Sequence, residues 1–232
     1  MRVQIKGIDA ANKNATDALS MLQTADGYLS EVNNLIKNFK ALAVQAANSI
    51  YSDAERQFSN FAIREIVAEI DRISSHAEFN GLKLLTGNYS RPTADSVPLM
   101  SLWFHIGHNA AKDSNAIRAY INTFNSTALQ INEISLSNPT LALDALQKVD
   151  LALSAVAQRR NDLASYQARL DSIITTTSIA KENAIASESV IRDTDIAEEV
   201  SELTKNLIVN QANIAMIAQA NAQLQTVLAL LG

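Results

Sequence analysis

The chain has 232 residues, of which 47% are hydrophobic and 19% charged, and this is enough apolar material for one or two packed domains. Its net charge of -5 argues against nucleic acid as the main partner, because phosphate binding needs a basic surface. The absence of cysteine excludes disulfides and thiolate metal sites, and the scarcity of glycine and proline favours long helices.

A long amphipathic helix is predicted over residues 8–46. Its apolar residues recur in steps of three and four, which is the heptad spacing that lines one face of a helix with a seam of core side chains. A helix of about 45 residues is about 68 Å long at a rise of roughly 1.5 Å per residue. The many alanines allow a partner helix to approach closely. The predicted seam is Ile8, Ala11, Ala15, Ala18, Leu22, Ala25, Leu29, Val32, Ile36, Phe39, Ala43 and Ala46.

The first helix is predicted to break over residues 48–53, and a second helix to begin after Ser52. Ser52 and Glu55 have the spacing of a capping box, in which each side chain bonds the backbone N–H of the other residue. A short turn between two long helices makes them antiparallel neighbours. The second helix runs to about Ala77, and its predicted seam is Ile63, Ile66, Ile70, Ile73 and Ala77.

The helical periodicity stops between residues 79 and 137. Asn80–Gly81 is a turn signal, and the apolar run Leu82–Leu85 follows it. The stretches LMSLWFHIG and AIRAYIN are rich in aromatic and β-branched residues, which favour strands. We therefore expect a small β or irregular insert here.

A third long helix is predicted to begin with Asn138 as its N-cap and Pro139 at its first position. It continues to about Ser189, with a seam of Ala142, Leu146, Val149, Leu153, Val156, Arg160, Leu163, Gln167, Leu170, Ile174 and Thr177. The stretch VIRDTD indicates a hinge, after which Thr194 or Asp195 caps a last helix. The apolar positions of that helix are Ile196, Val200, Leu203, Leu207, Ile214, Ile217, Leu224, Leu228 and Leu231.

The predicted fold is mainly α, an elongated antiparallel rod of long helices with a small insert and a C-terminal apolar helix. The expected domains are rod helices over 1–78, the insert over 79–137, a rod helix over 138–190 and the terminal helix over 191–232. The residues expected to pack the rod are Leu22, Leu29, Ile36, Ile66, Ile70, Leu146, Leu153 and Leu163.

The sequence predicts no catalytic, cofactor or metal site. His105 and His108 lie in a predicted strand, whose period of two places them on opposite faces, and packing or surface roles are favoured. Arg159–Arg160 is interpreted as a solvated helix edge rather than an anion site. The N-terminus lacks the continuous apolar core of a cleaved export signal, and no run of roughly 18 apolar residues predicts membrane insertion.

Several stretches in both halves resemble bacterial flagellin. In the first half these are NATDALSMLQTADGYLSEVNN, KALAVQAANSIYSDAERQ and EIVAEIDRISSHAEFNGLKLLTG. In the second half they are QRRNDLASYQARLDSII and the terminal stretch from SESVIRDTDIAEE to NAQLQTVLALLG. The motifs SLWFHIG and IYSDAERQ look most like the filament core flagellins of spirochaetes, which assemble in the periplasm.

The resemblance implies a structural subunit of the flagellar filament that polymerises through helical coiled-coil ends and serves motility. It implies export without a cleaved signal, to a periplasmic flagellum if the spirochaete likeness holds and otherwise to the cell exterior. The implied partners are other filament subunits, a flagellar export chaperone, filament cap and hook-junction proteins, and a filament sheath protein. The residues expected to serve assembly or chaperone binding are Leu203, Leu207, Ile214, Ile217, Leu224, Leu228 and Leu231.

Two alternative functions are also considered for a chain of long helices. A hook–filament junction protein shares helical ends with flagellin, but the stretches IDRIS, FNG and RDTDIAEE favour flagellin. A soluble helical binding module would also show alanine-rich seams. The formation of filaments would distinguish a flagellin from a soluble binding module.

The chain departs from the family pattern in two places. The stretch RVQIKGI, directly after Met1, resembles a family stretch that normally follows roughly fifty further residues; a fragment, a misassigned start or a deliberate truncation would explain this. We expect such a chain not to build normal filaments alone. In flagellins recognised by the vertebrate innate receptor, Arg, Leu and Glu occupy positions that here hold Asn38, Leu42 and Ala62, so that recognition is not expected.

Overall fold

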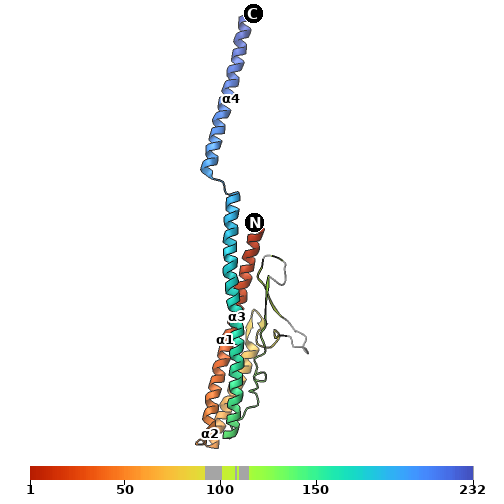
Figure 1. Ribbon diagram of the computed structural model, residues 1–232, viewed down its shortest axis with the longest axis vertical. Coiled ribbons are helices and arrows are strands. Elements are labelled where there is room, and N and C mark those ends of the chain that lie inside the picture. Colours follow the sequence, from red (N-terminus) through yellow and green to blue (C-terminus); the bar gives the residue numbers. More distant parts are fainter. Residues whose placement is uncertain (92–100, 108, 110–114, 232) are drawn as a thin grey trace. The chain divides into compact units, whose positions relative to one another are not determined.

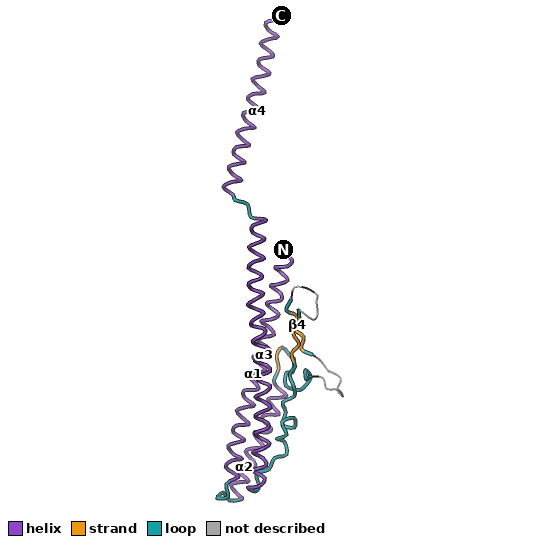
Figure 2. Tube along the Cα trace, in the orientation of Figure 1, coloured by secondary structure: helices purple, strands orange, loops and turns teal. Residues whose placement is uncertain are grey.

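The computed structural model describes residues 1–91, 101–107, 109 and 115–231, with side chains through residue 222. It forms two compact units, Met1–Asn183 and Ala184–Gly232. Long helices make up most of the chain (Figures 1 and 2), so the predicted fold class is confirmed. The elements are α1 (Arg2–Ala47), α2 (Asp53–His76), β1 (Glu78–Phe79), β2 (Leu82–Lys83), β3 (Leu102–His105), β4 (Ala116–Ala119), α3 (Pro139–Arg192) and α4 (Ile196–Leu231).

The apolar seam of α1 forms a large part of the core of the first unit. All twelve predicted seam residues are buried, and Met21 is buried with them. The seam alternates alanine with larger side chains, and this explains how a 46-residue helix can be buried along its length. The alanines let neighbouring segments approach closely, and Leu, Ile and Phe fill the remaining space. Leu22, Leu29 and Ile36 are completely inaccessible to solvent.

The connection between α1 and α2 is fixed by polar contacts. The predicted capping box is present: Glu55 N donates to Ser52 Oγ at 3.3 Å, and Ser52 N donates to Glu55 Oε2 at 2.7 Å. The buried Arg56 donates from Nη1 to the carbonyl oxygens of Ala46 at 3.3 Å and Asn48 at 3.2 Å. Since the last carbonyls of a helix have no partner inside it, Arg56 satisfies the end of α1.

Four contacts show that α3 runs antiparallel to α1. As residue numbers rise along α1 their partners on α3 fall, and the two helices lie side by side in Figure 1. The pairs are Asp9–Lys181 at 2.6 Å, Asn12–Thr177, Asp26–Arg160 at 2.7 Å and Lys40–Asp150 at 2.7 Å.

The insert is anchored on α2. Asp71 accepts from both the N–H and the hydroxyl of Ser126 at 2.7 Å, and Asn60 Oδ1 accepts from Leu136 N at 2.7 Å. The segment between β4 and α3 is therefore antiparallel to α2. This segment also places the start of α3, where Leu141 N donates to the predicted cap Asn138 at 2.8 Å.

Two antiparallel hairpins form the β part of the insert. β1 pairs with β2 across Asn80–Gly81, both of which have positive φ, as a two-residue hairpin turn requires. β3 pairs with β4, with Trp103 opposite Arg118. The strands predicted from LMSLWFHIG and AIRAYIN are thus present in part; residues 92–100, 108 and 110–114 lie outside the described residues.

Burial on α2 and α3 follows the predicted seams with local shifts. Of the predicted rod-packing residues, Ile70 and Leu163 are buried, whereas Ile66, Leu146 and Leu153 are half-buried against the core. Ala145 and Ala152, which precede Leu146 and Leu153, are buried instead. The alanines thus lie where α3 comes closest to the core, and the leucines lie beside them.

The second unit consists of the end of α3 and α4. Helical structure is interrupted over residues 193–195, where a hinge was predicted. Asp195, rather than Thr194, caps α4, since its Oδ1 accepts from Ala197 N at 2.8 Å. Across the described residues, no helix has the length and hydropathy needed to cross a membrane.

Candidate assembly surfaces

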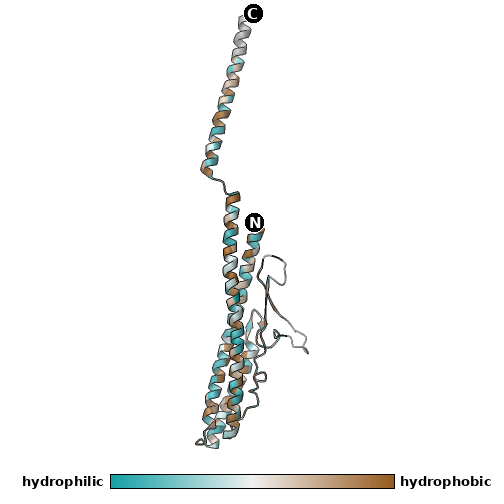
Figure 3. Cartoon of the chain, viewed as in Figure 1, coloured by the Kyte–Doolittle hydropathy of each residue, from teal (hydrophilic) through white to brown (hydrophobic). Residues whose placement is uncertain are grey.

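The helix α4 carries a stripe of apolar side chains. We define this stripe by the four of the seven predicted assembly residues whose side chains are described: Leu203, Leu207, Ile214 and Ile217. They are 57%, 53%, 65% and 62% exposed. Brown segments recur along the helix in Figure 3. The side chains of Leu224, Leu228 and Leu231 lie outside the described residues.

The stripe follows a heptad with two polar positions. From Ile196 onward, steps of four and three lead through the stripe and also reach Asn210 and Asn221. In coiled coils, an asparagine at a core position selects the register and the number of strands, at some cost in stability. The spacing of the stripe, with Asn210 and Asn221 at core positions, is therefore typical of a coiled-coil helix.

Further apolar side chains of α4 lie away from the stripe. Ile208, Val209 and Met216 are 61%, 49% and 72% exposed. At 100° per residue, none of the three falls on the stripe. A helix with apolar side chains on several sides suits burial among more than one neighbour.

The first unit has its own exposed apolar residues near the turn between α1 and α2. Ile50 is 80% exposed, Phe58 76% and Phe61 66%. Phe58 and Phe61 are one turn apart on α2, opposite its buried seam. The hydrogen bond from Asn60 Nδ2 to Ser137 Oγ, at 3.3 Å, places the start of α3 beside this part of α2. Leu143, in the first turns of α3, is 57% exposed.

These exposed aromatic residues were not among the predicted site residues. Their spacing in the sequence identifies them as lying off the α2 seam, which recurs in steps of three and four. Phe58 precedes Ile63 by five residues, and Phe61 precedes it by two. Phenylalanine at a solvent-facing helix position is uncommon and marks contact surfaces when several occur together.

The other residues singled out from the sequence are dispersed. Asn38 is exposed, while Leu42 and Ala62 are half-buried. His105 lies in β3, where its carbonyl oxygen accepts from Asn14 Nδ2 at 3.1 Å; His108 is outside the described residues. Over the described part of the chain, no three His, Asp or Glu side chains converge as a metal site would require.

Arg159 and Arg160 differ from the prediction of a shared solvated edge. Arg160 forms a two-pronged contact with Asp26, from Nε at 2.7 Å and from Nη2 at 3.1 Å, and is partly buried. Arg159 faces elsewhere and pairs with Asp162 at 3.0 Å. Consecutive helical residues point about 100° apart, which separates the two roles.

Comparison with protein families gives two matches, one in each half of the chain, separated by residues 91–145. Residues 1–90 match the bacterial flagellin N-terminal helical region, and residues 146–231 match the bacterial flagellin C-terminal helical region.

Sequence relatives of the chain include filament proteins of spirochaetes. The flagellar filament 33 kDa core protein of Treponema phagedenis is 40% identical over 237 residues, which cover 100% of this chain and 82% of the relative. The flagellar filament core protein flaB2 of Brachyspira hyodysenteriae is 42% identical, with the same coverage. The flagellin of Bacillus subtilis is 38% identical, covering 83% of that protein.

Solved structures share the fold at low sequence identity. The crystal structure of Bacillus cereus flagellin has a TM-score of 0.58 and 22% identity, covering 71% of this chain and 88% of that one. A putative flagellar hook-associated protein from Vibrio parahaemolyticus has a TM-score of 0.62 and 14% identity, covering 82% and 92%. Fold similarity alone therefore does not separate filament from junction proteins.

Proposed function

This chain belongs to the bacterial flagellin family, and on that premise we propose that its apolar α4 stripe is the surface through which it binds its partners. The chain is a structural subunit of the flagellar filament, and self-assembly is the property of the family. The family is a structural one, not known for catalysis. What remains to be assigned is which residues make the contacts.

The observation that carries the proposal is the exposure of the stripe within its own unit. Leu203, Leu207, Ile214 and Ile217 are each more than half exposed. Full burial of one large apolar side chain is worth roughly 1.5–3 kcal/mol, so covering this surface provides a strong drive for association. We infer that two partners cover it in turn: a flagellar export chaperone before assembly, then neighbouring subunits in the filament. In the sequence, Leu224, Leu228 and Leu231 continue the heptad spacing of the stripe.

The location follows from the same family membership. The chain is a component of the flagellar filament. We propose a periplasmic flagellum, supported by the relatives from Treponema and Brachyspira, and export without a cleaved signal. Cap, hook-junction and sheath proteins are the remaining partners in this proposal.

The alternatives are less well supported. One solved structure, named as a putative flagellar hook-associated protein, shares the fold, but relatives at 40–42% identity are named filament core proteins. A generic binding module has no comparable sequence relative among those described above.

The test replaces stripe residues by a polar residue that keeps the helix. In Leu207→Gln/Ile214→Gln/Ile217→Gln we expect loss of chaperone capture, measured by co-purification, and of incorporation into filaments of a flagellin relative, measured by electron microscopy of mixtures with that relative. The first unit should melt as in the parent chain. The matched control is Glu202→Gln/Asn206→Gln/Asn213→Gln, which exchanges exposed polar side chains of α4 for another polar one and alters neither the stripe nor the other apolar residues of the helix. Equal incorporation of both variants, or a sharply lower melting temperature for the stripe variant alone, would show the proposal to be wrong.

A further inference from the structure

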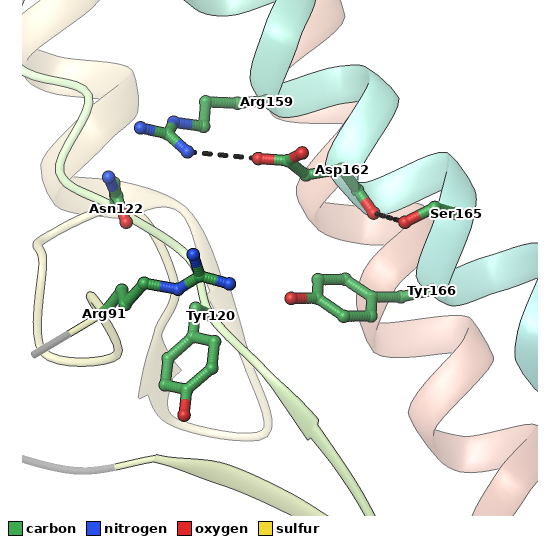
Figure 4. A pocket seen from close by; sticks show the side chains of 7 residues that line it. All are labelled: Arg91, Tyr120, Asn122, Arg159, Asp162, Ser165 and Tyr166. Carbon is green, nitrogen blue, oxygen red and sulfur yellow. Dashed lines mark hydrogen bonds and ion pairs between the residues drawn. The ribbon is translucent and has the colours of Figure 1, made fainter.

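The first unit contains a polar cavity beside α3. Its volume is about 550 Å³, within the range typical of small-molecule sites. Three separate segments line it (Figure 4): Arg91 follows β2, Tyr120 and Asn122 follow β4, and α3 contributes Arg159, Asp162, Ser165 and Tyr166. No aliphatic side chain is among these seven.

Arg91 is positioned by an aromatic ring and not by a carboxylate. Its guanidinium carbon lies 5.6 Å from the centre of the Tyr120 ring, within the range of a cation–π contact. Among the described residues, no carboxylate forms an ion pair with it. A contact with the ring uses none of the five N–H donors of the guanidinium in an ion pair, so these donors are available for an oxyanion.

Arg159 is only partly engaged on the opposite wall. Its Nη1 lies 3.0 Å from Asp162 Oδ2, and the two side chains are 44% and 53% exposed. A guanidinium carries five N–H donors, and this contact uses one of them. Ser165 donates to the Asp162 carbonyl at 2.7 Å, while the Tyr166 hydroxyl points into the space between Arg91 and α3 in Figure 4.

The charges in the cavity identify the class of ligand. Among the described residues that line it, two arginines and one aspartate leave one positive charge, on a chain whose net charge is -5. A singly charged carboxylate balances that charge and accepts the paired donors of a guanidinium, with amide and hydroxyl donors at its sides. A doubly charged phosphate would be left in excess beside Asp162. We propose that this cavity binds a carboxylate group between Arg91 and Arg159.

The carboxylate has two possible sources with the same chemistry. One is a small free organic acid. The other is an Asp or Glu side chain of a second copy, a source that rests on the filament function described above. The two differ in one measurable respect, since occupancy by a second copy rises with protein concentration.

The experiment observes the arginine Nε–H groups by NMR while glutarate, used as its singly charged monomethyl ester, is added to the whole chain. We expect saturable shifts of the Arg91 and Arg159 signals. Binding should weaken about tenfold or more in Arg91→Met and Arg159→Met, because each removes a hydrogen bond to a charged group. Arg91→Lys, which keeps the charge but not the planar fork, should recover part of the affinity. The matched control Arg169→Met, an exposed arginine of α3 outside the cavity, should bind as the parent does.

A dilution series without glutarate distinguishes the sources. If a second copy supplies the carboxylate, the same signals move with protein concentration, and added glutarate reverses the movement. If they do not move on dilution but respond to glutarate, a free acid is the ligand. Signals that respond to neither, or shifts that Arg169→Met reduces as much as Arg159→Met, would overturn the proposal. Failure here leaves filament incorporation through α4 unaffected, because that test uses different residues.

Discussion

Arg160 of α3 and Asp26 of α1 face each other with two parallel hydrogen bonds, of 2.7 and 3.1 Å. The hydrogen bonds that Arg160 donates to Asp26 raise the pKa of Arg160 above its ordinary value. Their side chains are 35% and 31% exposed, more enclosed than Lys40 and Asp150, which are 43% and 55% exposed. The geometry of a guanidinium fork fixes direction as well as distance, so this pair sets how α3 is aligned along α1.

The first prediction compares these two ion pairs. A double-mutant cycle with Asp26→Asn and Arg160→Met should give a coupling free energy of about 1 kcal/mol, because the pair is two-pronged and partly shielded. The cycle for Lys40→Met and Asp150→Asn should give less than about 0.5 kcal/mol, as exposed pairs do. Chemical denaturation of each variant measures both; equal coupling would contradict the role given to Arg160.

The second prediction concerns acid. Hydrogen bonds from the Ser52 backbone and side chain lower the pKa of Glu55 below its ordinary value of 4.5. The stabilisation from Glu55 is therefore fully present above pH 4.5 and is lost as the pH falls through the lowered pKa. Glu55→Gln should be less stable than the parent at pH 7, and the gap should close in acid. Glu65→Gln, an exposed change on the same helix, is the control, and a gap unchanged by pH would refute the assignment.

The third prediction addresses the exposed aromatic residues of α2. Phe58→Gln/Phe61→Gln should leave the melting temperature nearly unchanged, since both side chains are largely exposed. If this face contacts other subunits, the variant should be incorporated less than the parent into filaments of a flagellin relative, as seen by electron microscopy of mixtures with that relative. Gln57→Ala, a solvent-facing change beside Phe58, should have no effect. A large loss of melting temperature would mean that the rings support the fold instead.

The fourth prediction concerns Asn210 in the α4 heptad. Replacing it by leucine should strengthen association of α4, because a polar core residue costs stability, and should widen the range of oligomers formed. Analytical ultracentrifugation of Asn210→Leu measures both effects. Gln219→Leu adds the same side chain away from the stripe. A single oligomer of unchanged affinity for Asn210→Leu would contradict the idea that Asn210 selects the alignment.

Periodic features of this fold were predictable because they are local. The twelve-residue seam of α1, the Ser52–Glu55 box and the Asn138–Pro139 start each depend on residues a few positions apart. The Asp26–Arg160 pair joins positions 134 apart, and periodicity shows which face is buried but not which partner covers it. The cavity was missed for the same reason, as three distant segments line it. The role of the α4 stripe stays a prediction.

The contacts between α1 and α3 also bear on the order of folding. The α1–α2 connection and the β1–β2 hairpin join near neighbours in sequence, whereas Asn12 and Thr177 are 165 positions apart. Closing longer loops costs more chain entropy, and contacts at large sequence separation slow folding. Helix α3 is synthesised after every other described element of the first unit. The face of α1 that α3 buries therefore stays exposed until α3 has been synthesised. In a growing or refolding chain, this apolar face of α1 is therefore exposed to solvent until α3 packs against it. The extent of aggregation during refolding should depend on the rate of that packing step.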